Sequence, residues 1–152
     1  MHDFKKVLFP VDFSECSENA FPFALGIAKK YEARLYLIHV VRDLSHYKMM
    51  YIKPVMLDDV AVSLAEGAEK KMKEFCERRL SDFDNFETKV VVGEAGEEVL
   101  NYADEKEVDL IVICTHGRKG LNRTLLGSVA DGIIKGATIP VLSINPYRME
   151  LV

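Results

Sequence analysis

The chain has 152 residues, a formal net charge of −4 and 29% charged residues, which is typical of a soluble globular protein built as one domain. The negative balance gives no electrostatic reason to expect nucleic-acid binding. Three cysteines, Cys16, Cys76 and Cys114, lack zinc-ligand spacing and are expected to be reduced thiols in a cytoplasmic protein. No apolar run reaches the roughly 18 residues of a membrane span, and the first residues lack a signal-peptide pattern.

Five short apolar runs predict β-strands, and the segments between them carry helical periodicity. The predicted strands are residues 7–11, 34–41, 86–92, 108–114 and 140–144. Most of these runs are continuous rather than alternating, as expected for parallel strands that are covered on both faces. The predicted helices are residues 17–31, 59–83, 96–105 and 128–135, the second starting at the acidic pair Asp58–Asp59 and the last stopping at Gly136.

Strands and helices therefore alternate as βαβαβαβαβ. This order predicts an α/β fold, a single-domain, doubly wound, five-stranded parallel sheet with helices on both faces. In such sheets, ligands bind beyond the carboxyl ends of the strands, where the winding direction reverses. The residues expected to form a site are therefore those at the strand ends, namely 10–14, 39–42, 93–95 and from 114 onward.

One long irregular segment, residues 43–57, lies between the second predicted strand and the second predicted helix. It is rich in methionine and tyrosine, and loops of this length in compact domains are often functional or mobile. The segment is compatible with a flap that packs its own side chains on the body, with a lid over the strand ends, and with a surface for a partner.

The stretch 114-CTHGRKGLNRTLLGS-128 joins the fourth predicted strand to the fourth predicted helix. Its glycines, Gly117, Gly120 and Gly127, allow the main chain to approach a ligand closely, and free N–H groups at a helix start favour an anion. Ser128 could supply a hydroxyl to the same anion while capping the helix, and Arg118 is one of three cations in the loop. The spacing matches neither a P-loop nor a dinucleotide fingerprint. A phosphate cradle and an ordinary glycine-rich turn therefore both remain open on these grounds.

Asp12 and His39 follow the first two predicted strands. The Asp12 carboxylate could accept hydrogen bonds from a ribose hydroxyl, although Asp12 or Ser14 could instead cap the first helix. His39 ends a continuous apolar run, which favours a core histidine over a catalytic one. Its neighbour Val40 could present main-chain groups to the edge of a purine.

Cys114 ends the fourth predicted strand, and His116 follows it. His116 could donate to a phosphate or act as an acid–base group. Because local spacing places no nucleophile or carboxylate beside it, a structural or ligand-contact role is favoured. Cys114 closes a buried strand, which favours packing as a small hydrophobic residue.

Several segments of the chain resemble the universal stress protein family, in the same order and over nearly the whole length. They are 5-KKVLFPVDFSECSENA-20, 36-YLIHVV-41 and 108-VDLIVICTHGRKGLNRTLLGSVADGIIKGATIPVLSI-144. The ATP-binding branch of that family carries G-x2-G-x9-G-[ST]. Gly117, the nine residues 118–126 and the pair Gly127–Ser128 fit the pattern, whereas Cys114 stands at the first glycine. A cysteine there keeps the main-chain groups but adds a side chain, which implies tighter packing or weaker binding.

The resemblance implies a Rossmann-like, adenine nucleotide alpha hydrolase-like sheet with strand order 3-2-1-4-5, and a site for ATP or AMP. Asp12 matches the ribose contact, with Pro10 and Val11 on the same wall, and Val40 matches the position whose main chain meets adenine. Mg²⁺ or Mn²⁺ would accompany a triphosphate through its phosphates, with no side chain as metal ligand. A homodimer through Pro140–Ile144 is also implied, since an apolar edge strand requires covering. The expected nucleotide-binding residues are Pro10, Val11, Asp12, Val40, Cys114, His116, Gly117, Arg118, Gly120, Gly127, Ser128 and Val129.

The function favoured by these features is an adenine-nucleotide-binding regulatory or stress-response module. No catalytic residue is expected, because the sequence offers no convincing base or water-orienting carboxylate for phosphoryl transfer. A weak ATPase or nucleotide-driven switch, with residues 43–57 closing over the ligand, is the first alternative. A dimeric interaction module that has lost nucleotide binding, marked by Cys114, is the second.

Overall fold

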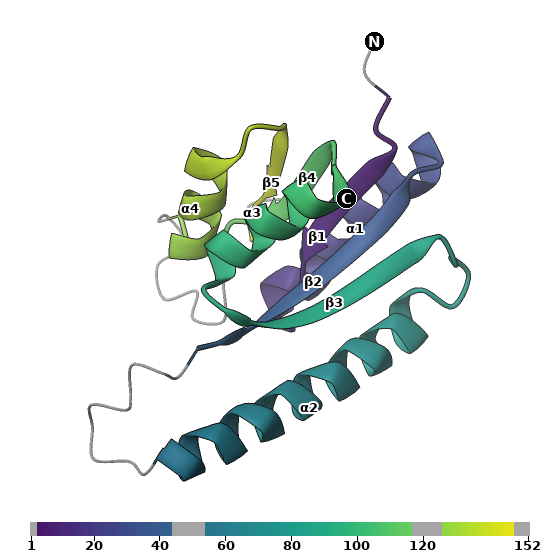
Figure 1. The fold of residues 1–152 in the computed structure, drawn as a ribbon. Helices are drawn as coiled ribbons and strands as arrows, with labels where there is room; N and C mark the ends of the chain where they lie inside the picture. Colours follow the sequence, from purple (N-terminus) through teal and green to yellow (C-terminus); the bar gives the residue numbers. More distant parts are fainter. Residues whose placement is uncertain (1–2, 44–53, 117–125, 148–152) are drawn as a thin grey trace.

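The computed structural model describes residues 3–43, 54–116 and 126–147, and the main chain alone of residues 54–58. Strands and helices alternate along these residues, as the sequence predicts (Figure 1). The elements are β1 (Lys6–Pro10), α1 (Glu15–Tyr31), β2 (Arg34–Arg42), α2 (Pro54–Arg79), β3 (Phe86–Gly93), α3 (Ala95–Lys106), β4 (Leu110–Cys114), α4 (Ser128–Gly136) and β5 (Val141–Ile144).

The strands form one parallel sheet in the order β3-β2-β1-β4-β5, which confirms the predicted topology. β1 lies at the centre, and its register pairs Lys6 with Arg34 of β2 and Val7 with Leu110 of β4. The chain moves outward from β1 through β2 to β3, then returns to β4 on the other side of β1. The winding direction therefore reverses between β1 and β4, which is where a doubly wound sheet opens a crevice.

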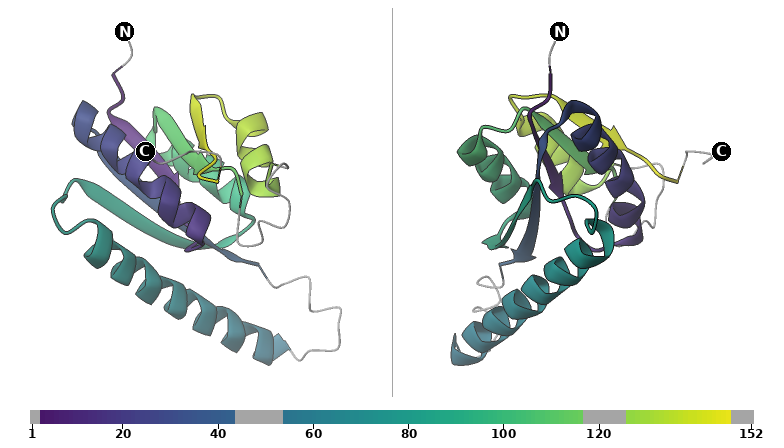
Figure 2. Two further views of the ribbon diagram at one scale, coloured as in Figure 1. Left: turned by 180° about the vertical axis from the view of Figure 1, so that it is seen from behind. Right: turned by 90° about the vertical axis from the view of Figure 1, so that its right-hand side faces the viewer.

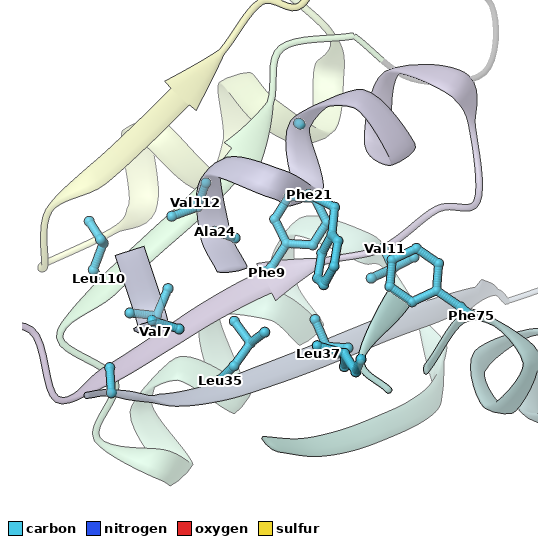
Figure 3. Close-up of a cluster of buried hydrophobic side chains, with 14 of the residues drawn as sticks. Val7, Phe9, Val11, Phe21, Ala24, Leu35, Leu37, Phe75, Leu110 and Val112 are labelled. Atoms are coloured by element: carbon cyan, nitrogen blue, oxygen red, sulfur yellow. The ribbon is translucent and has the colours of Figure 1, made fainter. Parts of the chain in front are cut away.

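Alternate residues of each strand face opposite sides of the sheet, so two cores form. Val7 and Phe9 of β1 pack with α1 and α2, whereas Leu8 between them packs with α3 and α4. The two helix layers are visible from the front and from behind (Figures 1 and 2). On the first face, the Phe21 ring lies 5.6 Å from that of Phe9 and 4.9 Å from that of Phe75, which ties both helices to the sheet (Figure 3).

The second helix starts earlier than the sequence analysis predicts. α2 begins at Pro54, so Asp58 and Asp59 lie inside the helix and do not start it. Proline suits the first turn of a helix because its missing N–H would have no partner there. The expected loop 43–57 is shortened accordingly, and residues 44–53 lie outside the described part of the chain.

The second half of α2 packs on the sheet, where Met72 and Phe75 are buried, whereas Val60 in the first half is exposed. Its carboxyl end is joined to the start of α1 by two ion pairs. The Glu18 carboxylate accepts from Arg78 at 2.6 Å and from Arg79 at 3.0 Å. The helix stops at Arg79 and not at Phe83, since the chain turns there and the Phe83 N–H donates to the Leu80 carbonyl. None of the helices in the described residues is long and apolar enough to cross a membrane.

Candidate functional site

A pocket of about 270 Å³ opens at the carboxyl ends of β1, β2 and β4, beside the start of α4. Nine of the residues expected from the sequence line it, namely Pro10, Val11, Asp12, Val40, Cys114, His116, Gly127, Ser128 and Val129. The other three, Gly117, Arg118 and Gly120, lie outside the described residues. Of the remaining lining residues, His39, Ala95 and Thr115 lie in the strand ends expected to form a site, whereas sequence reasoning did not single out Ile38, Val99, Ile113, Ala130 and Ile133. These five are apolar core residues, so nothing in their residue type distinguished them from the rest of the core.

The first wall follows β1, where Asp12 and Ser14 have separate roles. Ser14 is the N-cap of α1, and its hydroxyl oxygen accepts from the Ser17 N–H at 3.1 Å. Asp12 lines the pocket, and its Oδ1 accepts from the N–H and the hydroxyl of Ser14. α1 consequently begins at Glu15, two residues before the predicted start at Ser17. The sequence left open which of the two residues caps the helix, and here Ser14 caps while Asp12 faces the pocket.

Phe13, between them, has a left-handed main chain with φ 61°, which is uncommon for a bulky residue. Its ring lies 4.6 Å from the ring of His39 and 6.2 Å from that of Phe75, so packing holds this conformation. The turn at Phe13 leads the chain from the end of β1 into α1, and Asp12 directly precedes Phe13 in this turn. The orientation of Asp12 therefore depends on aromatic contacts made by its neighbour.

The second wall is the end of β2, which continues beyond the last residue of β1. Pro10 pairs with Ile38, and the Ile38 carbonyl accepts from the Val11 N–H at 2.8 Å. Main-chain groups of a strand alternate between its two neighbours, so Val40 directs its N–H and C=O to the same side as Ile38. Because β1 has ended at that level, these groups face the pocket.

His39, beside Val40, is half-buried and hydrogen-bonded. Its Nδ1 lies 2.6 Å from the Val11 carbonyl oxygen, and since a carbonyl can only accept, Nδ1 carries the proton. His39 thus has the structural role expected from the sequence, because it links β2 to the residue that follows β1 at the edge of the pocket.

The third wall is the start of α4. Gly127 is the N-cap, with extended backbone at φ −61° and ψ 149° and no side-chain hydrogen bond. Ser128 is the first helical residue, so the expected capping role of Ser128 is wrong; the cap position falls one residue earlier. Helix geometry gives the N–H groups of the first turn no partner inside the helix. Those of Ser128, Val129 and Ala130 therefore lie at the edge of the pocket with the positive end of the helix dipole behind them.

His116 and Cys114 form the floor between β4 and α4. His116 is 7% exposed, and its Nδ1 lies 2.7 Å from the Thr115 hydroxyl. Its Nε2 is buried and has no hydrogen-bond partner in the described structure. Buried polar atoms are nearly always paired, so this nitrogen is free to bond to a group that enters the pocket. Cys114 is half-buried, and its thiol donates to the His116 carbonyl at 3.2 Å.

The charges around the pocket are unevenly placed. Asp12 is the one carboxylate among the described lining residues, and it lies on the β1 wall. The helix start of α4, which carries partial positive charge, lies on the α4 wall. Within residues 3–43, 54–116 and 126–147, no group of three or more histidine, cysteine or acidic side chains is arranged to hold a metal ion. Among the described residues, the pocket therefore combines apolar side chains with one carboxylate and one helix start whose free N–H groups favour an anion.

Comparisons with known proteins identify the family of the chain. Universal stress protein MJ0531 of Methanocaldococcus jannaschii is 34% identical over 149 residues, covering 97% of this chain and 85% of that protein. The solved structure of MJ0577 from the same organism has a TM-score of 0.82 at 28% identity, covering 94% and 96% of the two chains. A universal stress protein in complex with cAMP shares the fold with a TM-score of 0.62 at 21% identity, covering 95% and 99%. Because residues 3–145 also match the model of the universal stress protein family, the chain belongs to that family.

Proposed function

We propose that this protein binds an adenine nucleotide, ATP or AMP, in the pocket between β1, β2 and α4, and acts as a regulatory or stress-response module. The observation that carries the proposal is the opposition of two complementary groups across one pocket. The Asp12 carboxylate suits ribose hydroxyls, and the uncapped start of α4 at Gly127 suits phosphate oxygens. A nucleotide carries ribose hydroxyls and phosphate oxygens on the same sugar, so one molecule can contact both protein groups.

The base would lie against the end of β2. An adenine ring needs one hydrogen-bond donor and one acceptor on its edge, and the main chain of Val40 offers both beyond the end of β1. Apolar side chains of Val11 and Ile38 would cover its faces. Main-chain recognition of this kind reads the edge of the base and is independent of the side chain at position 40.

The phosphates would lie at the start of α4. The first-turn N–H groups of Ser128 and Val129 are directed there, and the buried Nε2 of His116 would gain a partner. Cys114 retains the main-chain groups of the glycine it replaces in the family motif, so the departure is compatible with binding. With a triphosphate, Mg²⁺ or Mn²⁺ would be held through phosphate oxygens.

A holding role is favoured over rapid catalysis. In the described pocket, the carboxylate of Asp12 already accepts two hydrogen bonds from Ser14 and belongs to the ribose wall. Nδ1 of His116 is engaged by Thr115, which favours a contact role over a general base. We further propose a cytoplasmic homodimer formed through β5, where Leu142 is 39% exposed on an edge strand.

Calorimetry tests the proposal directly. Purified protein, freed of nucleotide by mild denaturation and refolding, is titrated with ATP, ADP, AMP and GTP, with and without Mg²⁺ or Mn²⁺. The expected result is saturable binding of adenine nucleotides and weaker binding of GTP, whose base carries a different edge. Absence of binding at millimolar adenine nucleotide, in protein shown to be folded by circular dichroism, overturns the proposal.

A further inference from the structure

A threonine and a histidine that are adjacent in the sequence hydrogen-bond to each other at the floor of the pocket. The Thr115 hydroxyl oxygen lies 2.7 Å from Nδ1 of His116, and both residues line the pocket. The other ring nitrogen, Nε2, is buried and has no hydrogen-bond partner among the described residues. What His116 can offer a ligand therefore depends on which of its two ring nitrogens carries the proton.

Main-chain hydrogen bonds hold Thr115 in place on two sides. Its N–H donates to the Ile144 carbonyl of β5 at 3.0 Å, and its carbonyl accepts from the Gly127 N–H at the start of α4 at 2.7 Å. The His116 ring also lies against Tyr147, whose ring centroid is 6.2 Å away in a T-shaped arrangement. These contacts fix the hydroxyl beside the imidazole, so the hydrogen bond between them decides where the imidazole proton lies.

We propose that Thr115 is a positioning residue whose hydroxyl donates to Nδ1 of His116, which places the imidazole proton on Nε2 as a donor for a phosphate oxygen. The distance of 2.7 Å is the usual length of a hydrogen bond from a hydroxyl, whereas an N–H donor usually lies about 2.9–3.0 Å from its acceptor. If Nδ1 carried the proton instead, the hydroxyl proton of Thr115 would have no acceptor among the described residues. Donation by the hydroxyl uses both groups fully.

A proton on Nε2 favours an anionic ligand. An N–H that meets an ionised oxygen makes a stronger hydrogen bond than one that meets a neutral oxygen, whereas a bare ring nitrogen would repel a phosphate. The first-turn N–H groups of α4 line the same pocket, so His116 would add a side-chain donor to main-chain donors. The role of the phosphate rests on the proposed function, whereas the position of the proton is a property of the nucleotide-free protein.

Nuclear magnetic resonance locates the proton in nucleotide-free protein. The full chain is labelled with ¹⁵N-histidine and measured at about pH 8.5, where free histidine is neutral, and the His116 signals are identified by their loss in His116→Gln. In the unchanged protein and in Thr115→Ser, Nε2 should carry the proton and Nδ1 should show the chemical shift of a hydrogen-bond acceptor. In Thr115→Val, which keeps the branched shape and the main-chain bonds, that acceptor shift should be lost. A proton on Nδ1 in the unchanged protein, or identical spectra in Thr115→Val, overturns the proposal.

Calorimetry with AMP and adenosine tests the role toward phosphate. Thr115→Val should lower the affinity for AMP by about three-fold or more and leave that for adenosine unchanged, because adenosine has no phosphate. Thr115→Ser should restore the affinity for AMP, and Thr115→Val should have no added effect in His116→Gln, where no imidazole is left to orient. Thr88→Val is the matched control, since Thr88 is exposed on β3 and lines a separate groove. Equal losses for AMP and adenosine would indicate a merely structural role and overturn the proposal.

The two measurements separate this inference from the proposed function. If the protein binds AMP but its nucleotide-free form carries the His116 proton on Nδ1, the proposed function stands and the inference fails. If the proton lies on Nε2 and no adenine nucleotide binds, the proposed function fails together with the phosphate role, and the orientation of His116 by Thr115 stands.

Discussion

The main-chain N–H of Gly127 donates to the carbonyl of Thr115 at 2.7 Å, which joins the start of α4 directly to the end of β4. The Thr115 N–H in turn donates to the Ile144 carbonyl at 3.0 Å, so the same strand end is fixed to β5. The helix start that faces the pocket is thus held by the sheet itself.

Gly127→Val should lower adenine-nucleotide affinity by about ten-fold or more, equivalent to roughly 1.4 kcal/mol. The backbone at φ −61° tolerates a side chain, but a branched one would enter the pocket where phosphate oxygens approach the helix. Calorimetric titration with ATP measures the change. The matched control is Gly132→Ala in the same helix, where an added Cβ has nothing within 4 Å. The control should keep its affinity and gain about 0.5–1 kcal/mol of stability; equal affinity losses would contradict the helix-start assignment.

Asp12→Asn should also lower nucleotide affinity by about ten-fold, because a hydrogen bond to a charged acceptor contributes roughly 1.5–3 kcal/mol. The cap of α1 is supplied by Ser14, so the fold should be retained. Asp109→Asn is the control, since Asp109 accepts main-chain N–H groups from Lys5 and Lys6 at the opposite end of the sheet. If both variants bind ATP as the unchanged protein does, the ribose role of Asp12 is refuted.

Stability should fall as pH rises from about 9 toward 11, in part through Cys76. Burial raises the pKa of the Cys76 thiol from 9.0 to about 11, so in this window the unfolded chain has lost a proton that the folded chain retains. The contribution is fully present below pH 9 and is lost at up to about 1.4 kcal/mol per pH unit. Urea unfolding at several pH values measures it. Cys76→Ala should flatten this decline, and an identical alkaline slope in both proteins would rule out the assignment.

Leu142→Lys should convert a homodimer to monomer, because Leu142 is 39% exposed on the edge strand β5 and burying an unpaired charge there is costly. Analytical ultracentrifugation over a range of concentrations gives the oligomeric state. Val92→Lys is the matched control, since Val92 is 42% exposed on the opposite edge strand β3. A sedimentation profile that is unchanged by Leu142→Lys, or equally changed by Val92→Lys, would argue against dimerisation through β5.

The pattern of apolar residues was sufficient to predict the order of strands and helices along the chain. Continuous apolar runs such as that around Leu8 and Ile111 identify buried parallel strands, and the alternation with helices restricts the topology to few choices. The strand ends at Asp12 and Val40 could be selected in the same way, because a doubly wound sheet places its crevice there. The start of α2 was misplaced, because the acidic pair Asp58–Asp59 outweighed the less specific signal of Pro54.

The sequence by itself determined the five parallel strands and the strand ends that meet at the pocket, since these follow from periodicity within short segments, whereas the strand order was implied by the resemblance to a known family. The tertiary structure decided that Gly127 and not Ser128 caps α4. It also decided that Phe13 lies at positive φ, with its ring 4.6 Å from the ring of His39. Each of these depends on contacts between segments distant in sequence, and local residue patterns carry no information about such contacts.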